Sequence, residues 1–177
     1  MKISCLIIVF AISTALFSFE KEYPVKSYNQ GINIVPKPLL LTQEQGVFIL
    51  NEDTRIEIKG DRSLIAVADY FKATINTSTG YKLPIAKSIE TNYIKILIDS
   101  SSTTNNEGYS LSSSAEGIII KAKTNQGIFY GLTTLMQLLP AEIDTPEMVS
   151  DVTWEIPFVS IQDEPRFPWR GFHIDVC

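Results

Sequence analysis

Hydrophobic and polar residues alternate along several short stretches of the chain, which is typical of half-buried β-strands. The clearest case is residues 54–60, where Ile56 and Ile58 alternate with charged side chains. The same period returns at residues 93–99. Residues 109–124 predict a hairpin of two strands around Ala115-Glu116-Gly117.

Two apolar runs near the start of the chain predict two further strands. The first covers residues 32–41 and is stopped by Pro36 and Pro38, because proline cannot donate to a strand ladder. The second is the short run at residues 46–50.

Two longer stretches change to the period of an amphipathic helix. In residues 61–84, Asp61 is the predicted N-cap and Gly80 the predicted stop. In residues 125–140, Asn125 is the predicted cap and Pro140 ends the helix. The apolar stripes comprise Leu64, Val67, Ala68, Phe71 and Ile75 in the first helix and Ile128, Leu132, Leu135 and Leu139 in the second, with Phe129 and Tyr130 also expected in the core.

The order of these elements predicts an α+β fold, with one mostly antiparallel sheet and two helices on one face. Residues 141–168 are rich in proline and acidic side chains and indicate a connecting strand followed by a linker. The last residues alternate again, so that the chain stops at Cys177 inside what reads as a buried strand. We therefore expect it to be cut off within a second domain.

Composition and charge exclude several classes of protein. The chain is 45% hydrophobic and 20% charged, which suffices for a core, and its formal charge is −5. With a pI near 4.9, nucleic acid and an acidic membrane surface are not expected as partners. With one histidine in the chain, and only Cys177 left once residues 1–18 are removed, we expect no internal disulfide, structural zinc or other cofactor.

Residues 1–18 have the charged start and apolar middle of a secretory signal peptide. Lys2 precedes an apolar run that is too short to span a bilayer comfortably. This predicts export to the periplasm or the extracellular space, with no other membrane contact. An uncleaved membrane anchor is the alternative.

Three stretches together resemble the family 20 glycoside hydrolases, the β-N-acetylhexosaminidases. They are INIVPKPLLL at residues 32–41, NQGIFYGLTTLMQLLP at 125–140 and EPRFPWRGFHIDV at 164–176. The resemblance implies that a small α+β domain precedes a TIM barrel, a fold of about 250 residues. The implied organisation is a signal peptide (1–18), a leader (19–31), a hexosaminidase-type accessory domain (32–165) and the first strand of a truncated (β/α)8 barrel (166–177).

The resemblance implies one substrate-binding residue in this chain, Arg170. In the family, the arginine of this Arg-Gly pair hydrogen-bonds hydroxyls of the terminal sugar, a task that suits its planar fork of donors. Without the resemblance, an ion pair with Asp163 or Glu164 is the alternative. The family's catalytic pair is also Asp followed by Glu, but it lies deep in the barrel after a His-x-Gly-Gly stretch. We therefore interpret Asp163 and Glu164 as solvated linker residues and expect no catalytic residue in this chain.

The remaining candidates near the end of the chain are interpreted as structural. His173 stands where relatives carry an apolar residue, and Asp175 matches an acidic position of the family strand. Trp154, Trp169 and Phe172 could stack on a sugar, but aromatic residues at a domain junction more often pack two domains together.

The implied activity is hydrolysis of terminal N-acetylglucosamine or N-acetylgalactosamine residues from glycans, by substrate-assisted retaining catalysis without a metal or organic cofactor. The 177-residue polypeptide alone is expected to be inactive. One alternative is a free-standing, non-catalytic module that binds carbohydrate or another partner. A second is another glycosidase with a similar α+β domain, such as an O-GlcNAcase-like enzyme or an α-glucuronidase. The oligomeric state, the linkage and the preferred sugar are left open.

Overall fold

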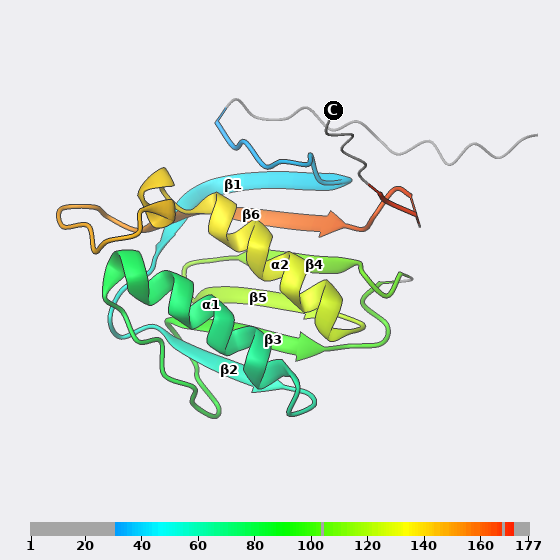
Figure 1. Cartoon of the computed structure of the whole chain (residues 1–177), viewed down its shortest axis with the longest axis horizontal. Helices are drawn as coiled ribbons and strands as arrows, with labels where there is room; N and C mark the ends of the chain where they lie inside the picture. Colours follow the sequence, from blue (N-terminus) through cyan, green and yellow to red (C-terminus); the bar gives the residue numbers. More distant parts are fainter. Residues whose placement is uncertain (1–30, 104, 168, 172–177) are drawn as a thin grey trace, which may run out of the picture.

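The computed structural model describes residues 31–103, 105–167 and 169–171, and a six-stranded sheet forms its centre (Figure 1). Helices α1 and α2 lie side by side on one face of this sheet, which confirms the predicted α+β class. The predicted signal peptide, the leader before Gly31, and the barrel strand from Phe172 onward, with His173 and Asp175, lie outside the described residues. The elements are β1 (Leu40–Ile49), β2 (Arg55–Lys59), α1 (Leu64–Thr79), β3 (Tyr93–Ile98), β4 (Tyr109–Ser113), β5 (Gly117–Ala122), α2 (Asn125–Leu138), the 3-10 helix η1 (Ala141–Asp144) and β6 (Glu155–Asp163).

The strand order across the sheet is β1-β6-β4-β5-β3-β2. The pairs β1–β6, β6–β4 and β4–β5 are antiparallel, whereas β5–β3 and β3–β2 are parallel. The sheet is thus mostly antiparallel, as predicted. The parallel β2–β3 pair follows from α1, which crosses over between these strands and so returns the chain in the same direction. β3 and β5 are parallel because β4, which lies between them in the chain, runs antiparallel to β5.

The prediction of two strands near the start of the chain is wrong. Residues 31–39 form no strand, and a single strand, β1, runs from Leu40 to Ile49, with a register irregularity between Gln43 and Val47. It takes in only the end of the first predicted strand but nearly all of the second. The two prolines, Pro36 and Pro38, explain the late start, since neither can donate a ladder hydrogen bond. Ile32 and Ile34 are nevertheless buried. The apolar residues at this place in the sequence therefore reflect packing in the core and not a strand.

The helices bury the stripes that their sequence predicts. Leu64, Ala68, Phe71 and Ile75 of α1 and Ile128, Leu132 and Leu135 of α2 are all buried, and they pack with the inner residues of β3, β4, β5 and β6 in one core. Gly80 ends α1 with a left-handed φ of 76°, as predicted.

The predicted N-caps are shifted by one or two residues. Ser63 is the N-cap of α1, and Asp61 instead accepts a hydrogen bond from the backbone N–H of Ser63. Thr124 caps α2 by accepting from the N–H of Gly127. In both places another polar side chain competes for the cap within a few residues, so the sequence fixes the helix start only approximately.

Candidate functional site

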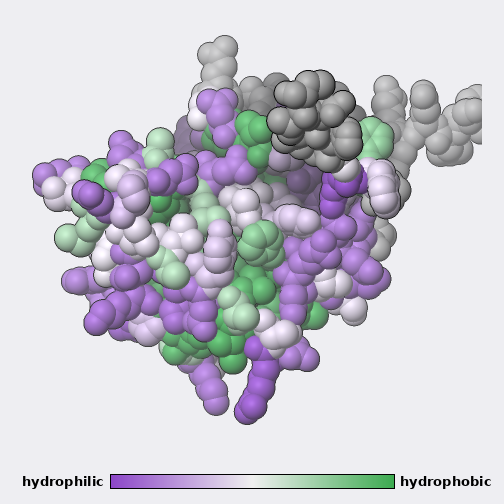
Figure 2. Space-filling model, in the orientation of Figure 1, coloured by the Kyte–Doolittle hydropathy of each residue, from purple (hydrophilic) through white to green (hydrophobic). Residues whose placement is uncertain are grey.

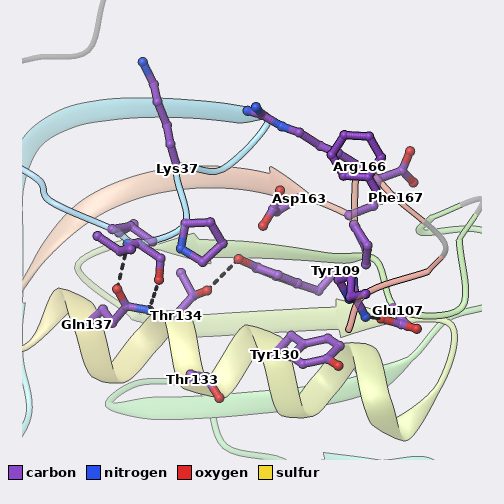
Figure 3. A pocket seen from close by; sticks show the side chains of 16 residues that line it. Lys37, Glu107, Tyr109, Tyr130, Thr133, Thr134, Gln137, Asp163, Arg166 and Phe167 are labelled. Carbon is purple, nitrogen blue, oxygen red and sulfur yellow. Dashed lines mark hydrogen bonds and ion pairs between the residues drawn. The ribbon is translucent and has the colours of Figure 1, made fainter. Parts of the chain in front are cut away.

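The main functional candidate is a pocket of about 530 Å³ beside α2 (Figure 3). Its walls come from three parts of the chain: residues 34–37, the outer side of α2, and the segment from Asp163 to Arg170 that leaves the sheet after β6. Glu107 and Tyr109, before and at the start of β4, complete it. The pocket therefore lies where the described chain leaves the α+β domain.

Hydrogen bonds hold the wall of this pocket in place. Gln137 of α2 accepts from the N–H of Val35 at 2.8 Å and donates to its carbonyl at 3.1 Å. The hydroxyl of buried Tyr109 lies 2.6 Å from that of buried Thr134. Figure 3 shows both contacts, which tie residues 34–37 and β4 to the same helix.

Asp163 is not a solvated linker residue, so this interpretation is wrong. It is the last residue of β6, pairs in register with Tyr109, and accepts a hydrogen bond from the N–H of Leu39 at 3.1 Å. Burial raises the pKa of Asp163, against the lowering effects of the N–H groups of Leu39 and Glu164. Glu164 is also partly buried. The strand extends to the edge of the pocket, and the predicted linker begins only after it.

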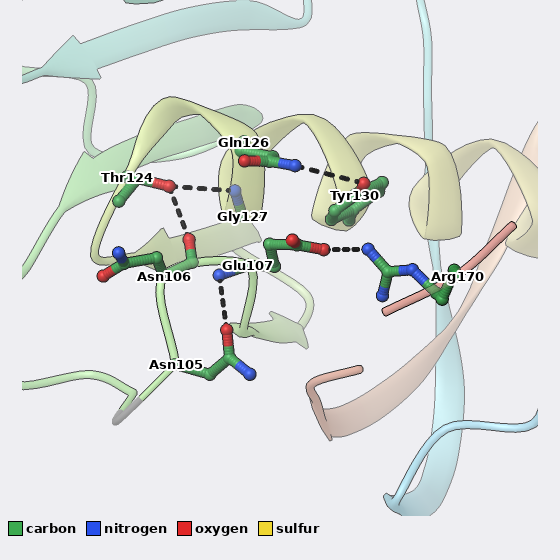
Figure 4. Close-up of polar contacts among 8 residues, drawn as sticks. All are labelled: Asn105, Asn106, Glu107, Thr124, Gln126, Gly127, Tyr130 and Arg170. Atoms are coloured by element: carbon green, nitrogen blue, oxygen red, sulfur yellow. Dashed lines mark hydrogen bonds and ion pairs between the residues drawn. The ribbon is translucent and has the colours of Figure 1, made fainter. Parts of the chain in front are cut away.

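Arg170 forms an ion pair with Glu107, not with Asp163 or Glu164 (Figure 4). The hydrogen bond to Glu107 raises the pKa of Arg170. About half of the Arg170 side chain is exposed, compared with a quarter of that of Glu107. The contact of Arg170 with a sugar stays a prediction.

The aromatic residues divide into buried and exposed groups. Trp154 is 2% exposed and belongs to the domain core, so it can neither stack on a sugar nor pack against a second domain. Trp169 is 87% exposed. Phe129 was expected in the core but is 38% exposed, and its ring is 5.7 Å from that of Tyr70 in α1. Figure 2 shows apolar residues grouped among polar ones on this side of the molecule, over the two helices. Tyr130 is partly buried and lines the pocket.

A second buried carboxylate, Glu57 of β2, lies away from the pocket. It pairs with Lys59 at 3.3 Å and with Lys95 at 3.6 Å and accepts from the N–H of Ile89. Burial alone would raise the pKa of Glu57, but the hydrogen bonds and the two lysine charges together lower it. The cluster joins β2, the strand at one edge of the sheet, to β3.

The polar residues that the sequence did not single out are Glu107 and Gln137. Each has its partner far away in the chain, 63 residues for Glu107 and 102 for Gln137, so no local pattern could reveal them. Among the described residues, no three His, Cys, Asp or Glu side chains are grouped so that they could hold a metal ion. None of the helices in the same part of the chain is long and apolar enough to cross a membrane.

Comparison with known sequences gives a consistent result. The model of "Glycosyl hydrolase family 20, domain 2" matches residues 31–164. The Beta-hexosaminidase of Porphyromonas gingivalis is 36% identical over 162 residues, which is 89% of this chain and 20% of that protein. The chain thus spans about a fifth of the length of this relative.

Solved structures agree on the fold. The GH20 β-N-acetylhexosaminidase of Streptomyces coelicolor superimposes with a TM-score of 0.70 at 29% identity, over 75% of this chain and 26% of that one. The N-acetyl-β-hexosaminidase of Streptomyces plicatus, solved in complex with Thio-NAglucal, gives a TM-score of 0.71 at 27% identity. This match covers 77% of this chain and 27% of that one. Both similarities concern a minor part of a longer protein.

Proposed function

The chain belongs to glycosyl hydrolase family 20, and on this premise we propose that it is the N-terminal portion of an exported β-N-acetylhexosaminidase. The observation that carries the proposal is the match of the family's second domain to residues 31–164, together with 36% identity to a β-hexosaminidase along nearly the whole chain. Because the chain spans only a fifth of that relative, we assign the activity to a longer polypeptide that contains it.

The proposed reaction removes a terminal N-acetylhexosamine from a glycan with retention of configuration. The carbonyl oxygen of the substrate's own acetamido group attacks the anomeric carbon, while a carboxylic acid protonates the departing glycosidic oxygen. Water then opens the cyclic intermediate at the same carbon. The acid and the carboxylate that orients the acetamido group would both belong to the barrel, beyond the described residues.

The described residues would serve this reaction by holding the segment that enters the barrel. Residues 165–170 leave β6 beside α2, and Arg170 is directed at Glu107. A guanidinium has five N–H donors, so donors remain for the hydroxyls of a sugar while one is bound to Glu107. We propose this contact as the contribution of Arg170.

The test is hydrolysis of a chromogenic N-acetyl-β-glucosaminide by the complete polypeptide and by the 177-residue chain. We expect activity from the former and none from the latter. In the complete polypeptide, Arg170→Lys keeps the charge but loses the planar fork, and should raise KM. An inactive complete polypeptide, combined with binding of glycans by the 177-residue chain, would replace this proposal by a non-catalytic carbohydrate-binding module.

A further inference from the structure

The loop before β4 is fixed to the start of α2. Within it, Asn105 accepts from the N–H of Glu107 at 2.9 Å through its side chain and from that of Gly108 at 3.2 Å through its carbonyl. The hydroxyl of Thr124, the cap of α2, donates to the carbonyl of Asn106 (Figure 4). These bonds join residues 105–108 to a helix that is itself packed in the core.

Close packing reinforces this arrangement. Gly127, in the first turn of α2, lies so near the loop that a Cβ at this position would be 2.4 Å from the carbonyl oxygen of Gly108. A Cβ on Gly108 would in turn be 3.2 Å from Cβ of Glu164, at the start of the departing segment. Two neighbouring glycines therefore allow helix, loop and departing segment to meet at one point.

From this rigid loop, the carboxylate of Glu107 reaches Arg170. Two large side chains of the departing segment are exposed on the surface: Phe167 is 69% and Trp169 is 87% exposed. Among the described residues beyond Pro165, Arg170 forms an ion pair with Glu107, and the charge of Arg166 acts on Asp163.

We propose that Glu107 is a positioning residue: through Arg170 it fixes the direction in which residues 169–171 leave the accessory domain. The inference rests on the proposed function only in taking this segment as the entrance to the catalytic domain. It does not require that Arg170 contacts a substrate. A partly exposed ion pair contributes only modestly to stability, and its contribution depends on the geometry of the two side chains. It can therefore favour one direction of the segment without holding it irreversibly.

The pair can be tested on the 177-residue chain by limited chymotrypsin digestion, because the exposed Trp169 offers a cleavable bond to Arg170. Glu107→Gln removes the charge and keeps the size of the side chain. Loss of an exposed ion pair should only modestly increase the fraction of molecules in which the segment is released from the domain and open to the protease. We therefore expect cleavage after Trp169 to become about two- to fivefold faster. The matched control is Glu116→Gln, in the exposed turn between β4 and β5, which should leave the rate unchanged.

Charge reversal separates a specific pair from general loosening. Because Arg170 follows the cleaved bond, Arg170→Glu is compared only with the double variant Glu107→Arg/Arg170→Glu, which carries the same bond. The double variant should be cleaved about two- to fivefold more slowly than Arg170→Glu alone. The inference is overturned if Glu107→Gln behaves like the control, or if the double variant is cleaved as fast as Arg170→Glu alone. Cleavage requires no hydrolase activity, so an inactive complete polypeptide with an intact pair would refute the proposed function and leave this inference standing.

Discussion

Ser113 offers a sharp test of how β6 is accommodated inside the sheet. β6 lies between β1 and β4, and Pro157 within it has no N–H to donate. Here the hydroxyl of Ser113 bonds the backbone of β6: it donates to the carbonyl of Pro157 at 2.6 Å and accepts from the N–H of Val159 at 2.8 Å. One side chain thus replaces two ladder contacts where the β4–β6 pairing ends.

Ser113→Ala removes both bonds without adding volume. Val159 is 2% exposed and Ser113 is 7% exposed, so water does not readily replace the hydroxyl at the buried N–H. Leaving a buried group unsatisfied costs about 1–3 kcal/mol. The Pro157 carbonyl is only partly buried and should contribute less. We therefore expect the free energy of unfolding to fall by about 2 kcal/mol, a large share of a typical 5–15 kcal/mol.

The assay is urea unfolding at 25 °C, followed by circular dichroism, with the m-value checked for constancy. Ser112→Ala is the matched control, because Ser112 lies on the same strand but is exposed. It should change the free energy of unfolding by less than about 0.5 kcal/mol. A loss for Ser113→Ala as small as that of the control would refute the argument that its hydroxyl completes the sheet.

Three further predictions concern stability. Because the pKa of Glu57 is lowered in the folded state, the unfolded chain binds this proton more tightly. The free energy of unfolding of the wild type should therefore fall relative to that of Glu57→Gln as the pH drops through and below the carboxyl's ordinary range. A constant difference between the two urea midpoints would contradict this. The raised pKa of Asp163 predicts the opposite sign, with the wild type gaining relative to Asp163→Asn as the pH falls, in the same titration. Gly127→Ala should reduce the free energy of unfolding by about 1–3 kcal/mol, because its Cβ would collide with the carbonyl of Gly108, whereas the exposed Gln126→Ala should not. Equal urea midpoints for the last two variants would argue against the close contact of loop and helix.

The sequence predicted those elements whose signal is local. β2 and β3 alternate clearly, the two helical stripes match the buried residues, and Gly80 stops α1 where the left-handed conformation is needed. The path of β1 was missed because the core residues Ile32 and Ile34 look like strand residues, although they precede it. Periodicity reports burial, and burial alone does not say which backbone hydrogen bonds are made.

The site could be predicted only in part, because its contacts join distant segments. Arg170 was singled out through a resemblance to the family, but its partner Glu107 lies in a stretch that the sequence marks only as a turn. The interpretation of Asp163 as a solvated linker residue rests on its place before the barrel and on the lack of a His-x-Gly-Gly stretch ahead of it. In the structure the last pairing of β6 with β4 reaches it, so the register of the sheet decides its burial.

The central claim is that the longer polypeptide carrying this chain is a substrate-assisted β-N-acetylhexosaminidase. The most direct measurement compares its kcat/KM for a chromogenic N-acetyl-β-glucosaminide with that for the β-glucoside that carries a hydroxyl in place of the acetamido group. Because the acetamido carbonyl is the proposed nucleophile, we expect hydrolysis of the first substrate and none detectable of the second. Comparable hydrolysis of both, or of neither, would contradict the account.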